Sequence, residues 1–107
     1  MAQEIGSVYV CEADLKENEL RGVKVEGQWI LIANHGGNYY GLDASCAHTG
    51  YPLFKGNLSS EGVITCPLHY AQFDCVSGKV VSDPRICEDQ TIFSIKVECG
   101  KVYWLKT

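Results

Sequence analysis

The stretch that decides the fold of this chain runs from Cys46 to His69 and reads CAHTGYPLFKGNLSSEGVITCPLH. It begins with a mixed pair, Cys46 and His48, that has one residue between its members. It ends with a second pair, Cys66 and His69, that has two. Two chemistries use four such ligands: a tetrahedral zinc ion, or a diiron cluster in which two His replace two Cys on one iron. The identity of the metal therefore decides the function.

Outside this stretch the sequence predicts strands separated by short turns. Glu26-Gly27 lies between two strand-like runs, 21–25 and 28–33, and this arrangement predicts a tight hairpin. Gly36-Gly37 predicts a second turn, because glycine tolerates positive φ. Residues 91–97 alternate between two faces, which predicts one further strand. Turns about every ten residues are typical of an antiparallel all-β sandwich or small barrel.

Length and charge limit the functions that fit. The 107 residues suit one domain. The formal net charge of −4 argues against nucleic-acid binding, which needs a basic face. The first residues lack the basic region and apolar run of a secretory signal, and no apolar stretch is long enough to cross a bilayer. We therefore expect a cytoplasmic protein with no membrane partner, whose six Cys are thiols or metal ligands.

The two pairs and their surroundings resemble the motif of Rieske iron–sulfur proteins, C-x-H followed at this distance by C-x2-H. This context favours the iron cluster over zinc. The resemblance implies an all-β fold, a Rieske-type antiparallel β-sandwich or barrel with a cluster-binding subdomain of two loops. Residues 1–107 then form a single Rieske domain, with that subdomain inserted at about 43–84 of a basal β-scaffold. The other matching residues are Gly50, Pro67, Phe73-Asp74 and Ser77-Gly78, together with the segments 39–43 and 95–98.

Carried over residue by residue, the resemblance implies one 2Fe-2S cluster. Cys46 and Cys66 hold one iron in this interpretation, and His48 and His69 hold the other. Each loop then gives one ligand to each iron. Neutral imidazoles replace two thiolates, so the cluster carries less negative charge and its potential lies above that of an all-Cys cluster. In the family, the thiolate-bound iron lies deeper and the His-bound iron lies near the surface, where electrons enter and leave.

Four positions separate this chain from the high-potential Rieske proteins of respiratory complexes. Tyr51 and Leu68 stand where those proteins have two further Cys that form a disulfide. Ala71 and Phe73 stand where they have hydroxyl groups that donate to cluster sulfurs. Losing such hydrogen bonds lowers the potential. The match is therefore to soluble, low-potential ferredoxins.

These ferredoxins imply a function in electron transfer. We expect a soluble one-electron carrier that relays electrons from a flavin-dependent reductase to a terminal oxygenase such as an aromatic ring-hydroxylating dioxygenase. We do not expect an enzyme, because a catalytic Rieske oxygenase also needs an iron held by two His and a carboxylate, and only His35 remains. Three alternatives stay open: the small Rieske-like subunit of a nitrite reductase, an iron–sulfur redox sensor, and a structural zinc module.

Several residues outside the tetrad also bear on the site. Tyr70, directly after the second His, either packs over the cluster or belongs to a docking surface. Cys75 is expected to be a small, buried apolar side chain, and His35 a solvated turn residue. Pro84 lies where relatives have a loop that covers the cluster. The remaining cysteines, expected to be semi-exposed thiols without a role, are Cys11, Cys87 and Cys99.

The absence of hydroxyl groups at Ala71 and Phe73 predicts the reduction potential of the cluster. We expect the midpoint reduction potential of the cluster to be roughly −150 mV, at the low end of the Rieske range. The reason is that neither Ala71 nor Phe73 donates a hydrogen bond to stabilise the added electron. Potentiometry followed by EPR of the reduced protein measures this value. A midpoint above about +100 mV contradicts the assignment to the low-potential class.

Overall fold

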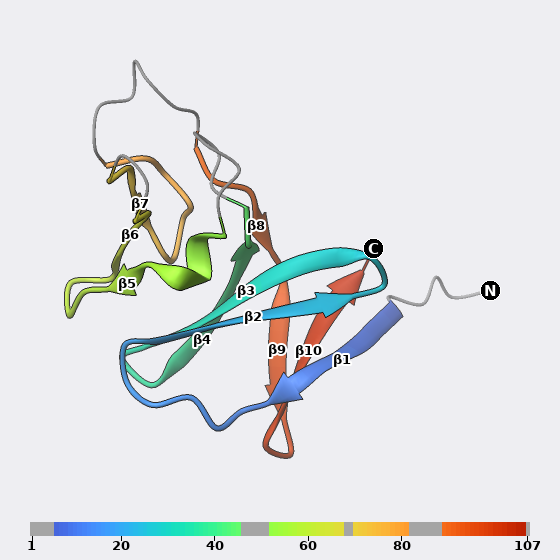
Figure 1. Cartoon of the computed structure of the whole chain (residues 1–107). Coiled ribbons are helices and arrows are strands. Elements are labelled where there is room, and N and C mark those ends of the chain that lie inside the picture. The colour runs from blue at the N-terminus through green and yellow to red at the C-terminus, as the bar shows by residue number, and fades with distance from the viewer. Residues whose placement is uncertain (1–5, 46–51, 68–69, 82–88, 107) are drawn as a thin grey trace.

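The computed structural model describes residues 6–45, 52–67, 70–81 and 89–106 (Figure 1). Within these ranges the chain forms ten strands, paired antiparallel, and one short 3-10 helix. No helix in the described residues is long and apolar enough to cross a membrane. The elements are β1 (Gly6–Glu12), β2 (Glu19–Val25), β3 (Gln28–His35), β4 (Asn38–Asp43), η1 (Leu53–Lys55), β5 (Asn57–Leu58), β6 (Val63–Thr65), β7 (Gln72–Asp74), β8 (Ile92–Phe93), β9 (Ile95–Glu98) and β10 (Lys101–Lys106).

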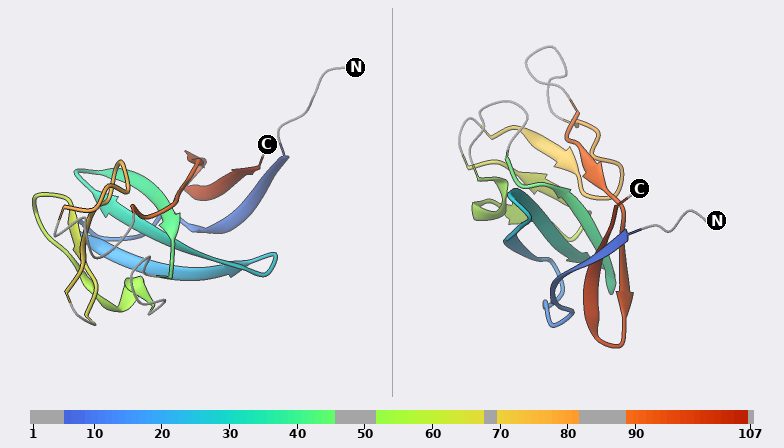
Figure 2. Two further views of the ribbon diagram at one scale, coloured as in Figure 1. Left: turned by 90° about the horizontal axis from the view of Figure 1, so that it is seen from above. Right: turned by 90° about the vertical axis from the view of Figure 1, so that its right-hand side faces the viewer.

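The strands form three antiparallel sheets. Their strand orders are β1-β10-β9, β2-β3-β4-β8 and β5-β6-β7. The first two sheets make up the part of the molecule that contains β1 and β10, whereas β5-β6-β7 and η1 lie at the other end (Figures 1 and 2). The predicted all-β, antiparallel architecture is thus present. The small third sheet holds part of the stretch that the sequence predicts to bind metal.

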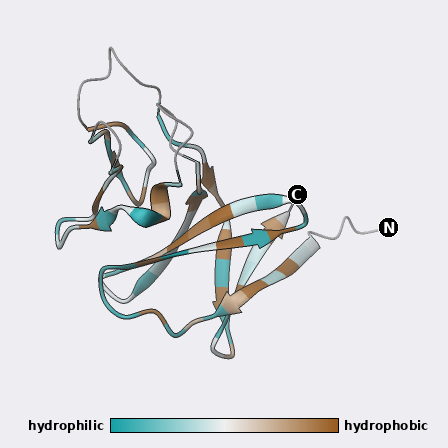
Figure 3. Cartoon of the chain, viewed as in Figure 1, coloured by the Kyte–Doolittle hydropathy of each residue, from teal (hydrophilic) through white to brown (hydrophobic). Residues whose placement is uncertain are grey.

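Strand β3 lies between two apolar cores. Successive side chains of a strand point to opposite faces, and Ile30, Leu31, Ile32 and Ala33 are all completely buried. The apolar stretch along β3 is visible in Figure 3. The first core, called here the scaffold core, consists of Val10, Cys11, Leu15, Val25, Ile30, Ile32 and Val102. The second, called here the loop core, consists of Leu31, Ala33, Leu42, Ala44, Leu53, Leu58, Ile64, Cys66, Ala71, Phe73 and Cys75.

The structure confirms both hairpins that the sequence predicts in the first half of the chain. Glu26 and Gly27 join β2 to β3 with φ values of 51° and 83°. Gly36 and Gly37 join β3 to β4 with φ values of 65° and 85°. Positive φ at both central residues is the type I′ geometry, whose twist matches that of the flanking strands. The turn chemistry therefore sets the register of the central sheet.

The predicted single strand over 91–97 is wrong in one respect. It is split at Ser94 into β8, which pairs with β4, and β9, which pairs with β10. The main-chain carbonyl of Ser94 accepts a hydrogen bond from the N–H of Leu105 at 2.8 Å. Phe93 and Ile95 are half-buried in spite of the break, whereas Val97 is exposed. The chain thus passes from one sheet to the other while its inward face continues.

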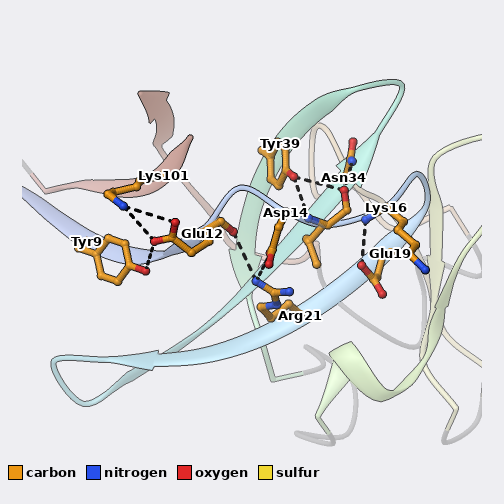
Figure 4. Close-up of polar contacts among 10 residues, drawn as sticks. Tyr9, Glu12, Asp14, Lys16, Glu19, Arg21, Asn34, Tyr39 and Lys101 are labelled. Carbon is orange, nitrogen blue, oxygen red and sulfur yellow. Dashed lines mark hydrogen bonds and ion pairs between the residues drawn. The ribbon is translucent and has the colours of Figure 1, made fainter. Parts of the chain in front are cut away.

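Polar contacts tie β1 to β2 and β10 (Figure 4). The guanidinium of Arg21 in β2 lies 2.8 Å from the carboxylate of Asp14, in the segment that follows β1. The carboxylate of Glu12 in β1 accepts the hydroxyl of Tyr9 at 2.6 Å and lies 3.3 Å from the ammonium of Lys101. This hydrogen bond is the main cause that raises the pKa of Tyr9 to about 12. Tyr9 therefore stays neutral throughout the physiological range.

The helix η1 connects the third sheet to the scaffold. The ring of Phe54 in η1 stacks on Trp29 of β3, with centroids 5.7 Å apart and planes at 18°. The same ring covers Gly22 of β2 so closely that a Cβ there would lie 2.3 Å from it. At the end of η1, a Cβ on Gly56 would lie 1.9 Å from the main-chain oxygen of Thr65. Gly22 therefore allows η1 to pack on β2, and Gly56 allows the end of η1 to approach β6.

Gly56 provides a steric test of this packing. We expect Gly56→Ala to destabilise the fold by about 3 kcal/mol, because the added Cβ meets backbone that cannot swing away. Its φ of −82° is open to alanine, so the loss is steric rather than conformational. Gly37→Ala is the matched control: its Cβ enters open space at φ +85°, and only the left-handed backbone costs about 1 kcal/mol. Urea unfolding of the metal-free proteins measures both, and an equal loss for the two variants contradicts the steric argument.

Candidate metal centre

The structure describes one of the four predicted ligands. Cys66 lies directly after β6, and its side chain is completely buried in the loop core. Cys46, His48 and His69 lie outside the described residues. The structure therefore describes the site by Cys66 and by the stems of the two ligand loops. A stem is here the pair of chain segments at the base of a loop.

The stem of the second loop is closed by a hydrogen bond. The main-chain N–H of Cys66 donates to the carbonyl of Ala71 at 2.8 Å, which holds these two residues side by side. Both are buried, whereas Pro67 and Tyr70 between them are exposed, Tyr70 to 73%. The described part of this loop therefore combines a buried sulfur with an exposed surface. That arrangement fits the expectation that the thiolate-bound iron lies deep.

The stem of the first loop is closed just outside residues 46–51. Ser45 and Pro52 form an antiparallel bridge. The N–H of Leu53 donates to the carbonyl of Ala44 at 2.6 Å. The carboxylate of Asp43 accepts the N–H of Ser45 at 2.9 Å, which fixes the chain as it enters the loop. Both ends of this loop are therefore anchored by hydrogen bonds to the body of the protein.

The two stems meet in the loop core. Ala44 and Leu53 come from the first stem, and Cys66, Ala71 and Phe73 come from the second, and all five are buried in one cluster. The predicted ligand loops thus start from a common apolar base although about twenty residues separate the pairs in sequence. Packing in the loop core therefore holds the stems of the two loops together.

Cys66, the described member of the predicted ligand set, fits a metal centre with thiolate ligands. The thiolate is the form of cysteine that binds metal, and a thiolate in apolar surroundings needs a compensating cation. Cys66 offers such a sulfur from the wall of the loop core. Within the described ranges, no three His, Cys, Asp or Glu side chains form a cluster suited to a metal ion.

Cys75 is buried, as predicted. Its side chain is completely inaccessible and belongs to the loop core with Cys66. Burial, together with the charge of Asp74, raises the pKa of Cys75 to about 11. The Asp74 carboxylate also accepts the N–H groups of Val76 and Ser77, at 2.8 and 3.1 Å, and so forms the turn after β7. Cys75 is therefore a neutral thiol that contributes packing.

The prediction for Cys11 is wrong, and that for Cys99 is confirmed. Cys99 is exposed in the turn between β9 and β10. Cys11 is buried, because the register of β1 against β10 shifts between Tyr9 and Cys11. A bulge of this kind breaks the alternation of faces, so Val10 and Cys11 both point into the scaffold core. Cys87, like Pro84, lies outside the described residues.

The prediction that His35 is solvated is also wrong. Strand β3 extends to His35, whose side chain is only 24% exposed. Its Nδ1 lies 3.4 Å from the side-chain oxygen of Asn18. On its other side the ring lies against Gly62, where a Cβ would come within 3.0 Å of Nε2. His35 therefore packs between the segment before β2 and the turn before β6.

A comparison with protein families identifies the type of centre. The model of the Rieske [2Fe-2S] domain matches residues 7–99. The chain belongs to the Rieske [2Fe-2S] domain family. Membership decides between the two metals in favour of the iron cluster, which accepts and releases one electron at a time when bound. The assignment of individual ligands stays a prediction.

Three of the matched proteins resemble this chain over most of their own length. The ferredoxin component of the alkene monooxygenase system of Xanthobacter autotrophicus (strain ATCC BAA-1158 / Py2) is 31% identical over 100 residues, which cover 92% of this chain and 80% of that protein. The ferredoxin component of the naphthalene 1,2-dioxygenase/salicylate 5-hydroxylase systems of a Ralstonia species is 33% identical over 92 residues, 86% of each chain. A chain in the complex of reduced oxygenase and oxidized ferredoxin in carbazole 1,9a-dioxygenase matches with a TM-score of 0.83 at 28% identity, covering 92% of both chains. The predicted Rieske-type fold is confirmed.

The predicted imidazole ligation can be tested by exchanging one donor. We expect His69→Cys to retain a cluster whose midpoint potential falls by more than about 100 mV, towards the roughly −400 mV of all-Cys clusters, because a thiolate adds negative charge. His35→Cys is the matched control and should leave the potential unchanged, since His35 packs against Gly62 and Asn18. Potentiometry on both variants measures the difference. The same potential in His69→Cys as in the unaltered protein contradicts the assignment.

Proposed function

We propose that this chain is a one-electron carrier that takes electrons from a flavin-dependent reductase and delivers them to a terminal oxygenase, such as an aromatic ring-hydroxylating dioxygenase. The observation that carries this proposal is the match over most of both chains to ferredoxin components of oxygenase systems. A chain of an oxygenase–ferredoxin complex has the same fold at 28% identity. The chain therefore corresponds to the electron-transfer component of such a system.

The proposal assigns the ligands as the sequence suggests. Cys46 and Cys66 bind one iron, and His48 and His69 bind the other. The burial of Cys66 supports this assignment, as does the common base from which both loops start. We place the cluster-binding subdomain at about 43–84, built on β5-β6-β7 and carried by the single domain of 1–107.

Tyr70 is the residue that we propose for contact with the oxygenase. It is the most exposed large side chain among the exposed hydrophobic residues of the described ranges, at 73%. It has a φ of 58°, which is unusual for a bulky residue and costs free energy. A strained and exposed aromatic ring directly after a predicted ligand suits a partner surface. An electron that leaves through the His edges would then cross a short distance to the acceptor.

Two parts of the proposal rest on sequence alone. The flavin-dependent reductase is inferred from the resemblance to ferredoxins of oxygenase systems, and the cytoplasmic location stays a prediction. The net charge of −4 permits salt-dependent docking to a basic surface on either partner. Electron transfer at low ionic strength should therefore be faster than at high ionic strength.

Anaerobic stopped-flow kinetics test the proposal. The reduced protein is mixed with the oxygenase components of carbazole 1,9a-dioxygenase, naphthalene 1,2-dioxygenase and alkene monooxygenase, and oxidation of its cluster is followed by absorbance. We expect rapid oxidation by at least one of them, and about tenfold slower oxidation of Tyr70→Ala at subsaturating oxygenase, because an interface anchor is lost. The midpoint potential of this variant should not change.

Tyr9→Ala is the matched control, since Tyr9 is 48% exposed and contacts Tyr103. It lies on β1, on the opposite side of the molecule from β5-β6-β7 (Figure 1). This variant should transfer electrons at the rate of the unaltered protein. A cluster that forms normally but is oxidised by none of the three oxygenases contradicts the carrier function and favours a redox sensor. Equal slowing by Tyr70→Ala and Tyr9→Ala contradicts the docking role of Tyr70 but leaves the carrier function standing.

A further inference from the structure

Gln90 is a buried polar residue that connects the stems of the two loops. It lies two residues before β8 and is 4% exposed. Its side-chain amide nitrogen donates to the carbonyl of Asp43 at 2.6 Å and to that of Ser45 at 2.5 Å. Both acceptors are carbonyl oxygens, so the NH2 group of the amide must face them, and each of its two protons has a partner. The entrance to the first loop is thereby held at two points.

The main chain of Gln90 holds the second loop's hairpin. Its N–H donates to the carbonyl of Gly78 at 2.6 Å. The contact is so close that a Cβ on Gly78 would lie 2.3 Å from the carbonyl oxygen of Gln90. Gly78 belongs to the turn after β7, and its N–H donates to the carbonyl of Asp74 at 2.8 Å. Since β7 pairs with β6, which leads into Cys66, this turn is part of the framework of the second loop.

These bonds complement the packing of the loop core. Apolar contacts between the two stems exclude water but are not directional. Hydrogen bonds fix distances and angles. Those of Gln90 link one residue to the entrance of the first loop and to the turn that supports the second loop. A cluster whose irons each take a ligand from both loops needs those loops at a set separation. A residue that sets this separation acts on the cluster without touching it.

We propose that Gln90 is a positioning residue that fixes the separation of the two ligand loops and thereby the retention and the electronic environment of the cluster. The proposal rests on the ligand set proposed above but on neither the oxygenase nor the reductase. In the described structure, Gln90 acts through the carbonyl groups of Asp43, Ser45 and Gly78. It is therefore distinct from a ligand and from a docking residue.

Two substitutions at Gln90 separate its donor function from its size. Gln90→Met keeps a similar volume but removes both side-chain hydrogen bonds. Gln90→Glu keeps the shape but directs carboxylate oxygens at two carbonyl oxygens, which adds repulsion. Gln28→Met is the matched control, because Gln28 also donates its amide to a main-chain carbonyl, that of Trp29 at 2.9 Å, at the hairpin between β2 and β3.

The loss of the cluster in the presence of an iron chelator is followed by absorbance. The unaltered protein must first show the spectrum of a 2Fe-2S cluster, which tests the ligand set separately. We expect about tenfold faster loss from Gln90→Met than from the unaltered protein, still faster loss from Gln90→Glu, and no change for Gln28→Met. EPR of the reduced Gln90 variants should show broadened or shifted g-values, which a purely structural effect on the scaffold would not produce.

Unchanged g-values together with an unchanged rate of loss in Gln90→Met overturn the proposal, and so does an equal effect of Gln28→Met. If circular dichroism shows that neither Gln90 variant folds, hydrogen exchange of the unaltered protein decides. The backbone N–H of Gln90 should then exchange as slowly as that of Leu53, which closes the first stem. Rapid exchange at Gln90 beside slow exchange at Leu53 overturns the proposal.

Discussion

The position of β3 between two cores is the constraint on which the rest of the structure depends. Because side chains alternate along a strand, Ile30 and Ile32 complete the scaffold core while Leu31 and Ala33 complete the loop core. The backbone of β3 is paired with β2 on one side and β4 on the other. In a close-packed interior, the loop core cannot shift without moving this strand. The stems of the two loops therefore pack against a strand that is paired on both edges and buried on both faces.

The stems reduce the entropy that cluster binding must overcome. Ordering a free loop costs roughly 1–2 kcal/mol per residue, and a stem that is already paired leaves few residues to order. The first loop has only residues 46–51 between its bridge at Ser45 and Pro52. The second is closed by the bond between Cys66 and Ala71. Short loops on fixed stems suit a centre that must hold the same geometry in two oxidation states.

The sequence predicts those parts of the structure that have a local signal. The hairpins at Glu26-Gly27 and Gly36-Gly37 follow from residues that accept positive φ. The break at Ser94 has no such signal, because alternation continues when the chain changes sheets. The bulge that buries Cys11 likewise depends on pairing with β10, a strand far away in sequence.

The candidate site shows the same division between local and non-local information. The Cys and His pairs stand out because their spacing is itself the signal, and the family match supports the cofactor that they imply. Gln90 has no motif around it, since its role depends on carbonyl groups about 45 residues earlier in the chain. Likewise, the two-residue β5 and the three-residue η1 are too short for a periodic pattern.

The side chains buried around Cys66 bear on the reduction potential that we expect for the cluster. Ala71, Phe73 and Cys75 are buried with Cys66 in the loop core, and Cys75 stays protonated. The side chains of Ala71 and Phe73 have no hydroxyl group, so those two positions give no side-chain hydrogen bond to the cluster. With the ligand set proposed above, an added electron gains no stabilisation from side chains at these two positions, and we expect the reduced protein to be a stronger reductant. Under the function proposed above, this property favours delivery of the electron to the acceptor.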